Sequence, residues 1–224
     1  MTPDARRFTP GAYRAHSNDA AMNSKGKIER LKAYHEAGHA VVARTLGLTL
    51  SYVTTLSTDD MTAGGALANS ASWLAREADQ ATRLAAIEKD MKACLAGPHA
   101  QKQYQPRKNK RTPNEWASDF NLAKSLATKA VLITNGRGAD IPIGEGPFKV
   151  TLEFDDLLEI EQLFNRISNE TEAIVAELWP AIAHVAEELL SRRTLFEDEV
   201  DALIDASRRA QNRMASTHRA RYPR

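Results

Sequence analysis

The chain has 224 residues, of which 42% are hydrophobic and 26% charged, and its formal net charge is +1. This composition excludes the intrinsically disordered and fibrous classes, and the length allows one sizeable core or two compact subdomains. Basic runs at residues 102–111 and 208–224 are offset by acidic runs elsewhere. Such runs are typical of solvated loops and tails, so no nucleic-acid partner is expected.

Nothing in the sequence indicates export or membrane insertion. The first 27 residues lack the apolar stretch of a secretory signal, and no run approaches the roughly 18–20 apolar residues of a membrane helix. Cys94 is the only cysteine, so no intrachain disulfide can form, and its helical spacing favours a small buried side chain over a reactive thiol. We expect a cytoplasmic protein with no membrane segment.

The N-terminal part of the chain predicts a flexible arm, a helix and two short strands. Residues 1–25 are rich in Ser, Asn, Gly, Pro and charged side chains, which is typical of a loose arm. Apolar residues then recur with helical spacing from residue 28 to residue 46, and Gly47 is expected to end that helix. Residues 48–56 predict a strand, and residues 65–67 predict a second one.

The rest of the chain predicts helices. Residues 70–95 form the next expected helix, which Gly97-Pro98 breaks or bends, followed by a basic loop at 101–113. A helix is expected at 115–134, and four glycines and two prolines at 135–148 predict a long loop or lid. Residues 154–213 are helical in pattern, with Thr194 and Glu197 as a capping box. The predicted fold is mainly α, with a small β hairpin or sheet after the first helix.

The pentapeptide His35-Glu36-Ala37-Gly38-His39 lies within the first predicted helix. Histidines four residues apart lie on one helix face and can both bind a single zinc ion. Glu36 lies beside them as a candidate general base. Gly38 costs a helix about 1 kcal/mol relative to alanine, which a close approach of a second helix would explain.

A catalytic zinc needs a third protein ligand, and the spacing after His39 does not supply one. Distant candidates are an Asp, a Glu or another histidine. His16 and His218 lie in the arm and tail, His184 lies in a late helix, and His99 is a weaker candidate. Among the carboxylates Asp119 stands out, although a solvated acid in the first turn of a helix is the alternative.

Three segments together resemble the FtsH-type AAA proteases. AYHEAGHAVV at 33–42 is similar to the zinc-binding helix of that family, CLAGPHAQ at 94–101 to its small-residue helix, and ASDFNLAKSLATKAV at 117–131 to the helix that carries its third ligand. A weaker likeness, LLSRRTLFEDEVDALI, occupies residues 189–204. The resemblance covers roughly residues 27–205 and implies a zinc-peptidase domain with His35, His39 and Asp119 as ligands.

The chain also departs from that family. It contains no G-x-x-x-x-G-K-[ST] motif, so the resemblance leads us to expect a free-standing, ATP-independent peptidase unit. In the small-residue helix, Pro98 and Gln101 replace an arginine and a glutamate, which predicts reduced turnover. The expected organisation is an arm at 1–25, a peptidase-like domain at 26–206 (a zinc-site part at 26–134 and a helical part at 150–206), and a basic tail at 207–224.

The resemblance implies a zinc-dependent endopeptidase that hydrolyses unfolded or flexible polypeptides. A separate ATPase or an oligomeric partner is expected to supply the unfolding force. The strand around Tyr52, Val53, Thr54 and Thr55 is a candidate edge for an extended peptide, with Gly64 and Gly65 allowing its backbone to come close. A purely structural strand is the alternative there. The alternative function is a binding or regulatory module with weak or no catalysis.

Overall fold

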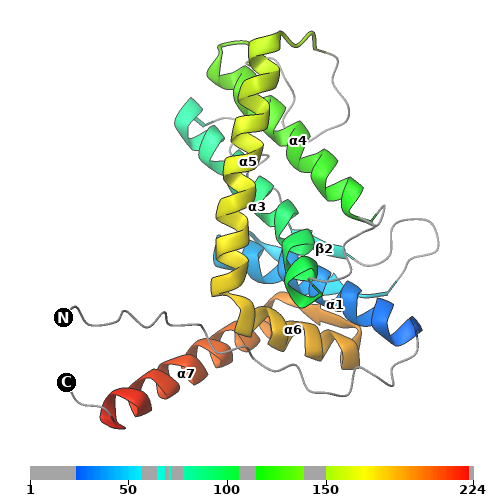
Figure 1. Ribbon diagram of the computed structural model, residues 1–224, viewed down its shortest axis with the longest axis vertical. Helices are drawn as coiled ribbons and strands as arrows, with labels where there is room; N and C mark the ends of the chain where they lie inside the picture. Colours follow the sequence, from blue (N-terminus) through cyan, green and yellow to red (C-terminus); the bar gives the residue numbers. More distant parts are fainter. Residues whose placement is uncertain are drawn as a thin grey trace, which may run out of the picture.

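The computed structural model describes residues 24–56, 65–68, 71, 78–105, 115–138 and 150–221 of the chain. Six helices and three short strands make up this part, so the protein is mainly helical, as predicted (Figure 1). In chain order they are α1 (Ser24–Thr45), β1 (Leu50–Thr54), β2 (Gly65–Ala68), α3 (Gln80–Tyr104), α4 (Glu115–Thr134), α5 (Phe154–Glu177), α6 (Trp179–Arg192), β3 (Thr194–Phe196) and α7 (Glu197–Arg221).

The end of α1 agrees with the sequence. Gly47 has a positive φ of 78°. Its N–H donates to the carbonyl of Arg44, and the N–H of Leu48 donates to the carbonyl of Ala43. This pair of bonds satisfies carbonyls that the last helical turn leaves unpaired, and it needs a left-handed residue for which glycine has no steric cost.

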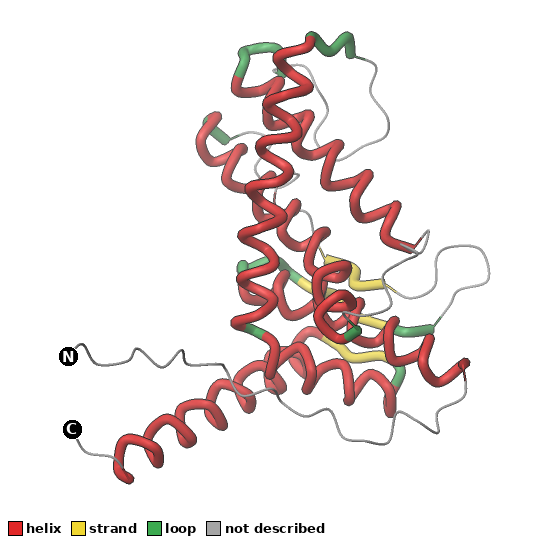
Figure 2. The backbone as a smooth tube through the Cα atoms, viewed as in Figure 1, coloured by secondary structure: helices red, strands yellow, loops and turns green. Residues whose placement is uncertain are grey.

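The strands form one antiparallel sheet in the order β2-β1-β3, which lies among the helices (Figure 2). The first two strands match the predicted ones, but the third was not expected. Thr194 was predicted to cap a helix with Glu197. Instead its hydroxyl lies 2.8 Å from that of Thr54 across the sheet, and Glu197 accepts from the N–H of Leu50. The capping prediction is wrong because both side chains form hydrogen bonds with residues distant in the chain instead of with the start of a helix.

The helix α3 departs from its predicted bounds at both ends. It begins at Gln80, where the Asp79 side chain accepts from the Thr82 N–H, and it continues without a break through Pro98 to Tyr104. Proline removes one helical hydrogen bond. The helix persists there because Ala96, Gly97 and Ala100 are buried, and tertiary packing supplies most of a helix's stability. The basic loop therefore begins after Tyr104, and residues 106–114 lie outside the described part.

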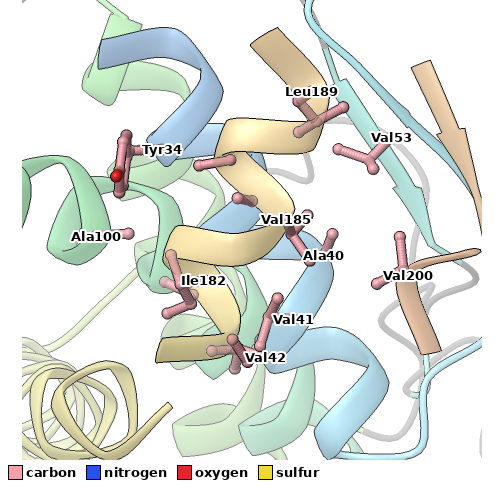
Figure 3. Close-up of a cluster of buried hydrophobic side chains, with 14 of the residues drawn as sticks. Tyr34, Ala40, Val41, Val42, Val53, Ala100, Ile182, Val185, Leu189 and Val200 are labelled. Atoms are coloured by element: carbon pink, nitrogen blue, oxygen red, sulfur yellow. The ribbon is translucent and has the colours of Figure 1, made fainter. Parts of the chain in front are cut away.

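Two hydrophobic clusters hold the helices together. The first joins α1 to α6, α7 and the sheet and also takes in buried residues of α3 and α5, and Figure 3 shows Val41 and Val42 of α1 among Ile182 and Val185 of α6. The second joins α3, α4 and α5 through Ile87, Met91, Leu95, Ala123, Leu126, Ala130, Ile133, Ile160, Phe164 and Ile167. The helix α1, which carries the H-E-x-x-H motif, packs against α3, and α3 contributes residues to both clusters.

The predicted N-terminal arm lies largely outside the described part of the chain, whereas most of the predicted C-terminal tail lies within it. Residues 1–23 lie outside the described part, and α1 already begins at Ser24, just before the expected boundary. The basic segment from residue 207 is not a separate unit, because α7 runs without interruption from Glu197 to Arg221 and extends away from the other helices (Figure 1).

Among the described helices, none combines the length and the apolar character needed to cross a membrane.

Candidate metal centre

The helix α1 presents the three motif residues to the interior. His35 is 9% exposed and Glu36 is 5% exposed. The rings of His35 and His39 stand edge to face with centroids 4.7 Å apart, as expected for neighbours four residues apart on one helix face. Polar side chains at this depth need partners, because burial without them is costly.

The helix α3 packs directly behind these residues through two glycines. A Cβ on Gly38 would lie 2.6 Å from the Ala100 Cβ and 2.7 Å from the Ala96 carbonyl oxygen, so only glycine allows the backbones this close. This confirms the close approach expected from a glycine within the helix. A Cβ on Gly97 would lie 2.3 Å from Nε2 of His39, so Gly97 leaves the space that the imidazole occupies.

Residues of α3 also orient both imidazole rings. Nδ1 of His39 lies 2.7 Å from the Ala93 carbonyl oxygen, and Nδ1 of His35 lies 3.2 Å from Oε1 of Gln101. A carbonyl oxygen only accepts, so each Nδ1 carries a proton and donates it. In the neutral rings the lone pairs are then on the two Nε2 atoms, which lie 3.1 Å apart.

Asp119 enters from α4 and completes a triangle with the two imidazoles. Its Oδ2 lies 3.2 Å from Nε2 of His35 and 3.7 Å from Nε2 of His39. Tetrahedral zinc with bonds of about 2.0–2.2 Å places any two ligand atoms roughly 3.3–3.6 Å apart. The three predicted ligands, from segments 80 residues apart (119 − 39), have their ligand atoms 3.1–3.7 Å apart, which is close to that spacing.

The electrostatics of the triangle favour a cation. Oδ2 of Asp119 is buried and has no partner of hydrogen-bond geometry among the described residues. Burial raises the pKa of Asp119, but the imidazoles of His35 and His39 outweigh this effect and hold it well below its ordinary value. Burial lowers the pKa of His39, but Asp119, Glu36 and the Ala93 carbonyl more than offset it and raise the pKa to about 9. A proton and a divalent metal would compete for the same position.

Glu36 lies beside the triangle without belonging to it. Burial raises the pKa of its carboxyl, and the neighbouring imidazoles of His39 and His35 oppose that rise. A carboxylate that binds protons more readily than usual is suited to general-base work near neutral pH. Its role as a general base stays a prediction.

Gly97 and Trp116 were not identified from the sequence as part of this site, and Gln101 was treated only as the replacement of a glutamate. Gly97 was interpreted only as part of a helix break, whereas it makes room for His39. Gln101 was expected to reduce turnover because a neutral amide replaces a glutamate there, and its amide oxygen accepts from His35 and also from Nε1 of Trp116, at 2.7 Å. Their spacing could have grouped them, because Ala93, Gly97 and Gln101 follow one another at intervals of four residues and therefore share one face of α3.

The remaining histidines of the described part lie elsewhere. Nε2 of His99 is 3.0 Å from the Ser168 hydroxyl, and Nδ1 of His184 is 3.2 Å from that of Ser207. Neither joins the cluster of possible metal ligands. His16 and the side chain of His218 lie outside the described residues.

The strand expected to bind a peptide at its edge is the central strand of the sheet. Tyr52, Val53 and Thr54 pair with β2 on one side and β3 on the other, and the Thr55 N–H donates to the carbonyl of Arg193. The expected edge binding by Tyr52 to Thr55 is therefore wrong, because their backbone groups are already paired. Gly65 pairs with Thr54, and Gly64 lies outside the described residues. Whether these side chains contact a substrate stays a prediction.

No protein-family model and no curated protein sequence matches the chain. The likeness to FtsH-type peptidases therefore rests on the quoted motifs.

Proposed function

We propose that the chain is a zinc-dependent endopeptidase that hydrolyses unfolded or flexible polypeptides and is related to the FtsH-type peptidases. The observation that carries the proposal is the triangle of His35, His39 and Asp119, whose ligand atoms lie 3.1–3.7 Å apart beside a buried glutamate. Surface acids and histidines often cluster without function. A largely buried cluster with both Nδ1 atoms engaged and a carboxylate oxygen that faces both Nε2 atoms is better explained by a metal.

Each residue has a distinct role in this proposal. His35, His39 and Asp119 would hold the zinc, while Gln101 and the Ala93 carbonyl orient the two imidazoles. Bound zinc supplies a Lewis acid that polarises a peptide carbonyl and acidifies water. Glu36 accepts the proton of the attacking water and returns it to the leaving amine.

The sheet suggests how a peptide would reach the site. Within the described part, β2 pairs only with β1, so its outer side is the free edge that β1 lacks, and β2 also contacts α1. An extended peptide added there would be held by main-chain hydrogen bonds, with little dependence on its sequence. Only an unfolded or flexible segment can adopt this conformation, which agrees with the proposed substrates and with a separate ATPase or oligomeric partner for folded ones.

Metal analysis is the first test of the proposal. The purified protein is expected to contain about one zinc per chain by mass spectrometry, as a single three-ligand site requires. His35→Ala should lose it. His184→Gln, which removes a histidine of α6 far along the chain, should keep it. A wild-type protein that binds no zinc at equilibrium would exclude the proposal.

Cleavage is the second test. Wild-type protein should cut casein or a quenched peptide pool, and Glu36→Gln should keep its zinc but lose cleavage by a factor of about 100 or more, as expected for a general base. Glu29→Gln, on the same helix, should cleave normally. Equal cleavage by wild type and Glu36→Gln would indicate a contaminant, and zinc binding without any cleavage would favour the regulatory module.

A further inference from the structure

We propose that Trp116 and Gln101 act together as a positioning pair that keeps His35 in the one tautomer able to bind metal. The inference rests on the proposed zinc site and adds two residues to it. Both side chains are buried, each 5% exposed, and they come from different helices, Gln101 from α3 and Trp116 from α4.

The geometry gives the amide oxygen two donors. Oε1 of Gln101 lies 2.7 Å from Nε1 of Trp116 and 3.2 Å from Nδ1 of His35. An indole N–H can only donate, so the atom it meets must be the oxygen of the amide and not its nitrogen. The same oxygen faces His35, whose Nδ1 must then carry the proton. Nε2 is left with its lone pair directed toward Asp119 and His39.

A neutral amide needs a partner that fixes its orientation, whereas a carboxylate does not. The oxygen and nitrogen of an amide have almost the same shape, so rotation by 180° exchanges an acceptor for a donor at little steric cost. A rotated Gln101 would present N–H to Nδ1 of His35, which would move the ring proton to Nε2 and block metal binding. Trp116 opposes that rotation, because its own N–H would then face the amide N–H groups.

The helix α4 therefore supplies two parts of the site at once. Trp116 and Asp119 are three residues apart and lie on one face of α4, so a single docked helix brings both the third ligand and the residue that fixes Gln101. The metal site thus has a built-in requirement that α4 be docked on α3.

A double-mutant cycle measured by zinc affinity tests the pair. Gln101→Leu should weaken zinc binding about 10–100-fold, and Trp116→Phe, which keeps a ring but removes the N–H, about tenfold. In the Gln101→Glu background, Trp116→Phe should cost nothing further, because both carboxylate oxygens accept in either orientation. Competition with a chromophoric zinc chelator gives the affinities of all five proteins, wild type included.

Two control variants separate positioning from packing. Phe120→Leu removes the ring that contacts Trp116 at 6.2 Å between centroids without removing a hydrogen bond. Gln80→Leu removes a glutamine of the same helix as Gln101 whose amide donates to the Ile133 carbonyl. Both should leave zinc affinity unchanged, even where they lower the melting temperature.

The tautomer of His35 gives a readout that needs no metal. Nitrogen-15 spectra of the metal-free protein, recorded at a pH where the ring is neutral, should show the proton on Nδ1 in wild type and a mixture in Trp116→Phe, with Gln101→Glu restoring Nδ1. A wild-type ring protonated on Nε2, or equal losses of affinity for Trp116→Phe in both backgrounds, would overturn the pair. A protein with the Nδ1 tautomer that binds no zinc would overturn the proposed function alone.

Discussion

His39 is the residue on which a proton and a metal compete most directly. Its Nδ1 is held by the Ala93 carbonyl and its Nε2 faces the Asp119 carboxylate. The neighbouring carboxylates raise its pKa to about 9, against the opposing effect of burial. The ring is therefore protonated below about pH 9 in the metal-free protein, and a metal ligand must be neutral.

Zinc binding is thus expected to release about one proton near neutral pH, with affinity falling about tenfold for each pH unit below 9. Affinity falls toward low pH because the pKa of His39 is raised, so acid protonates the ring and stabilises the metal-free protein. Calorimetry in two buffers of different ionisation enthalpy counts the proton. His184→Gln should give the same count, and an affinity that is flat from about pH 7 to 9 would contradict the assignment.

Gly97 controls the space available to the same ring. Gly97→Ala places a Cβ 2.3 Å from the present position of Nε2 of His39, so the imidazole must move. The substitution should lower zinc affinity by about 100-fold or more. The metal-free protein should remain within about 1 kcal/mol of wild type, because the imidazole can rotate away and alanine is the better helix former. Chelator competition and urea denaturation measure the two effects. A large loss of stability with unchanged zinc affinity would contradict this view of Gly97.

At the scale of elements, the contact between α1 and α3 sets the depth of the site. The two helices approach so closely at Gly38 that backbone oxygen lies against it. That contact brings Ala93, Gly97 and Gln101 of α3 within reach of the histidines of α1. Helix propensity and packing predict opposite effects on stability for the substitution of Gly38 by alanine.

Gly38→Ala should destabilise the protein by about 1–3 kcal/mol, as overpacking does, although propensity alone would stabilise α1 by about 1 kcal/mol. The neighbouring Ala96 carbonyl belongs to a helix backbone and cannot move aside cheaply. Urea denaturation of the metal-free protein measures the sign. A stabilised Gly38→Ala variant would show that the helices do not pack this closely.

At the scale of the whole molecule, the candidate metal site joins α1 to α4. The helix α1 contributes to the first cluster and α4 to the second, while α3 contributes to both, through Ala96 and Ala100 in the first. His35 and His39 come from α1 and Asp119 from α4, and their side chains meet beside α3. A bound ion would therefore oppose separation of α1 and α4.

Zinc at about 100 times its dissociation constant should add about 2.7 kcal/mol of stability and raise the melting temperature by about 5–10 °C. Asp119→Ala should abolish the shift. Asp205→Ala, an exposed acid of α7, should preserve it. Differential scanning fluorimetry with and without zinc measures the effect, and an equal shift in Asp119→Ala would show that zinc binds elsewhere.

The sequence by itself determined the helical character, the end of α1 at Gly47, the first two strands and the placement of His35 and His39 on one face of α1, because these depend on periodicity, glycine conformation and spacing within one helix. Asp119 was reached through a motif likeness, and only the structure brings it to 3.2 Å from His35. Only tertiary structure decided that Thr194 pairs with Thr54, that α3 continues through Pro98, and that Gln101 faces both His35 and Trp116. Each of these depends on contacts between residues distant in the chain, which override the local preferences that a sequence pattern records.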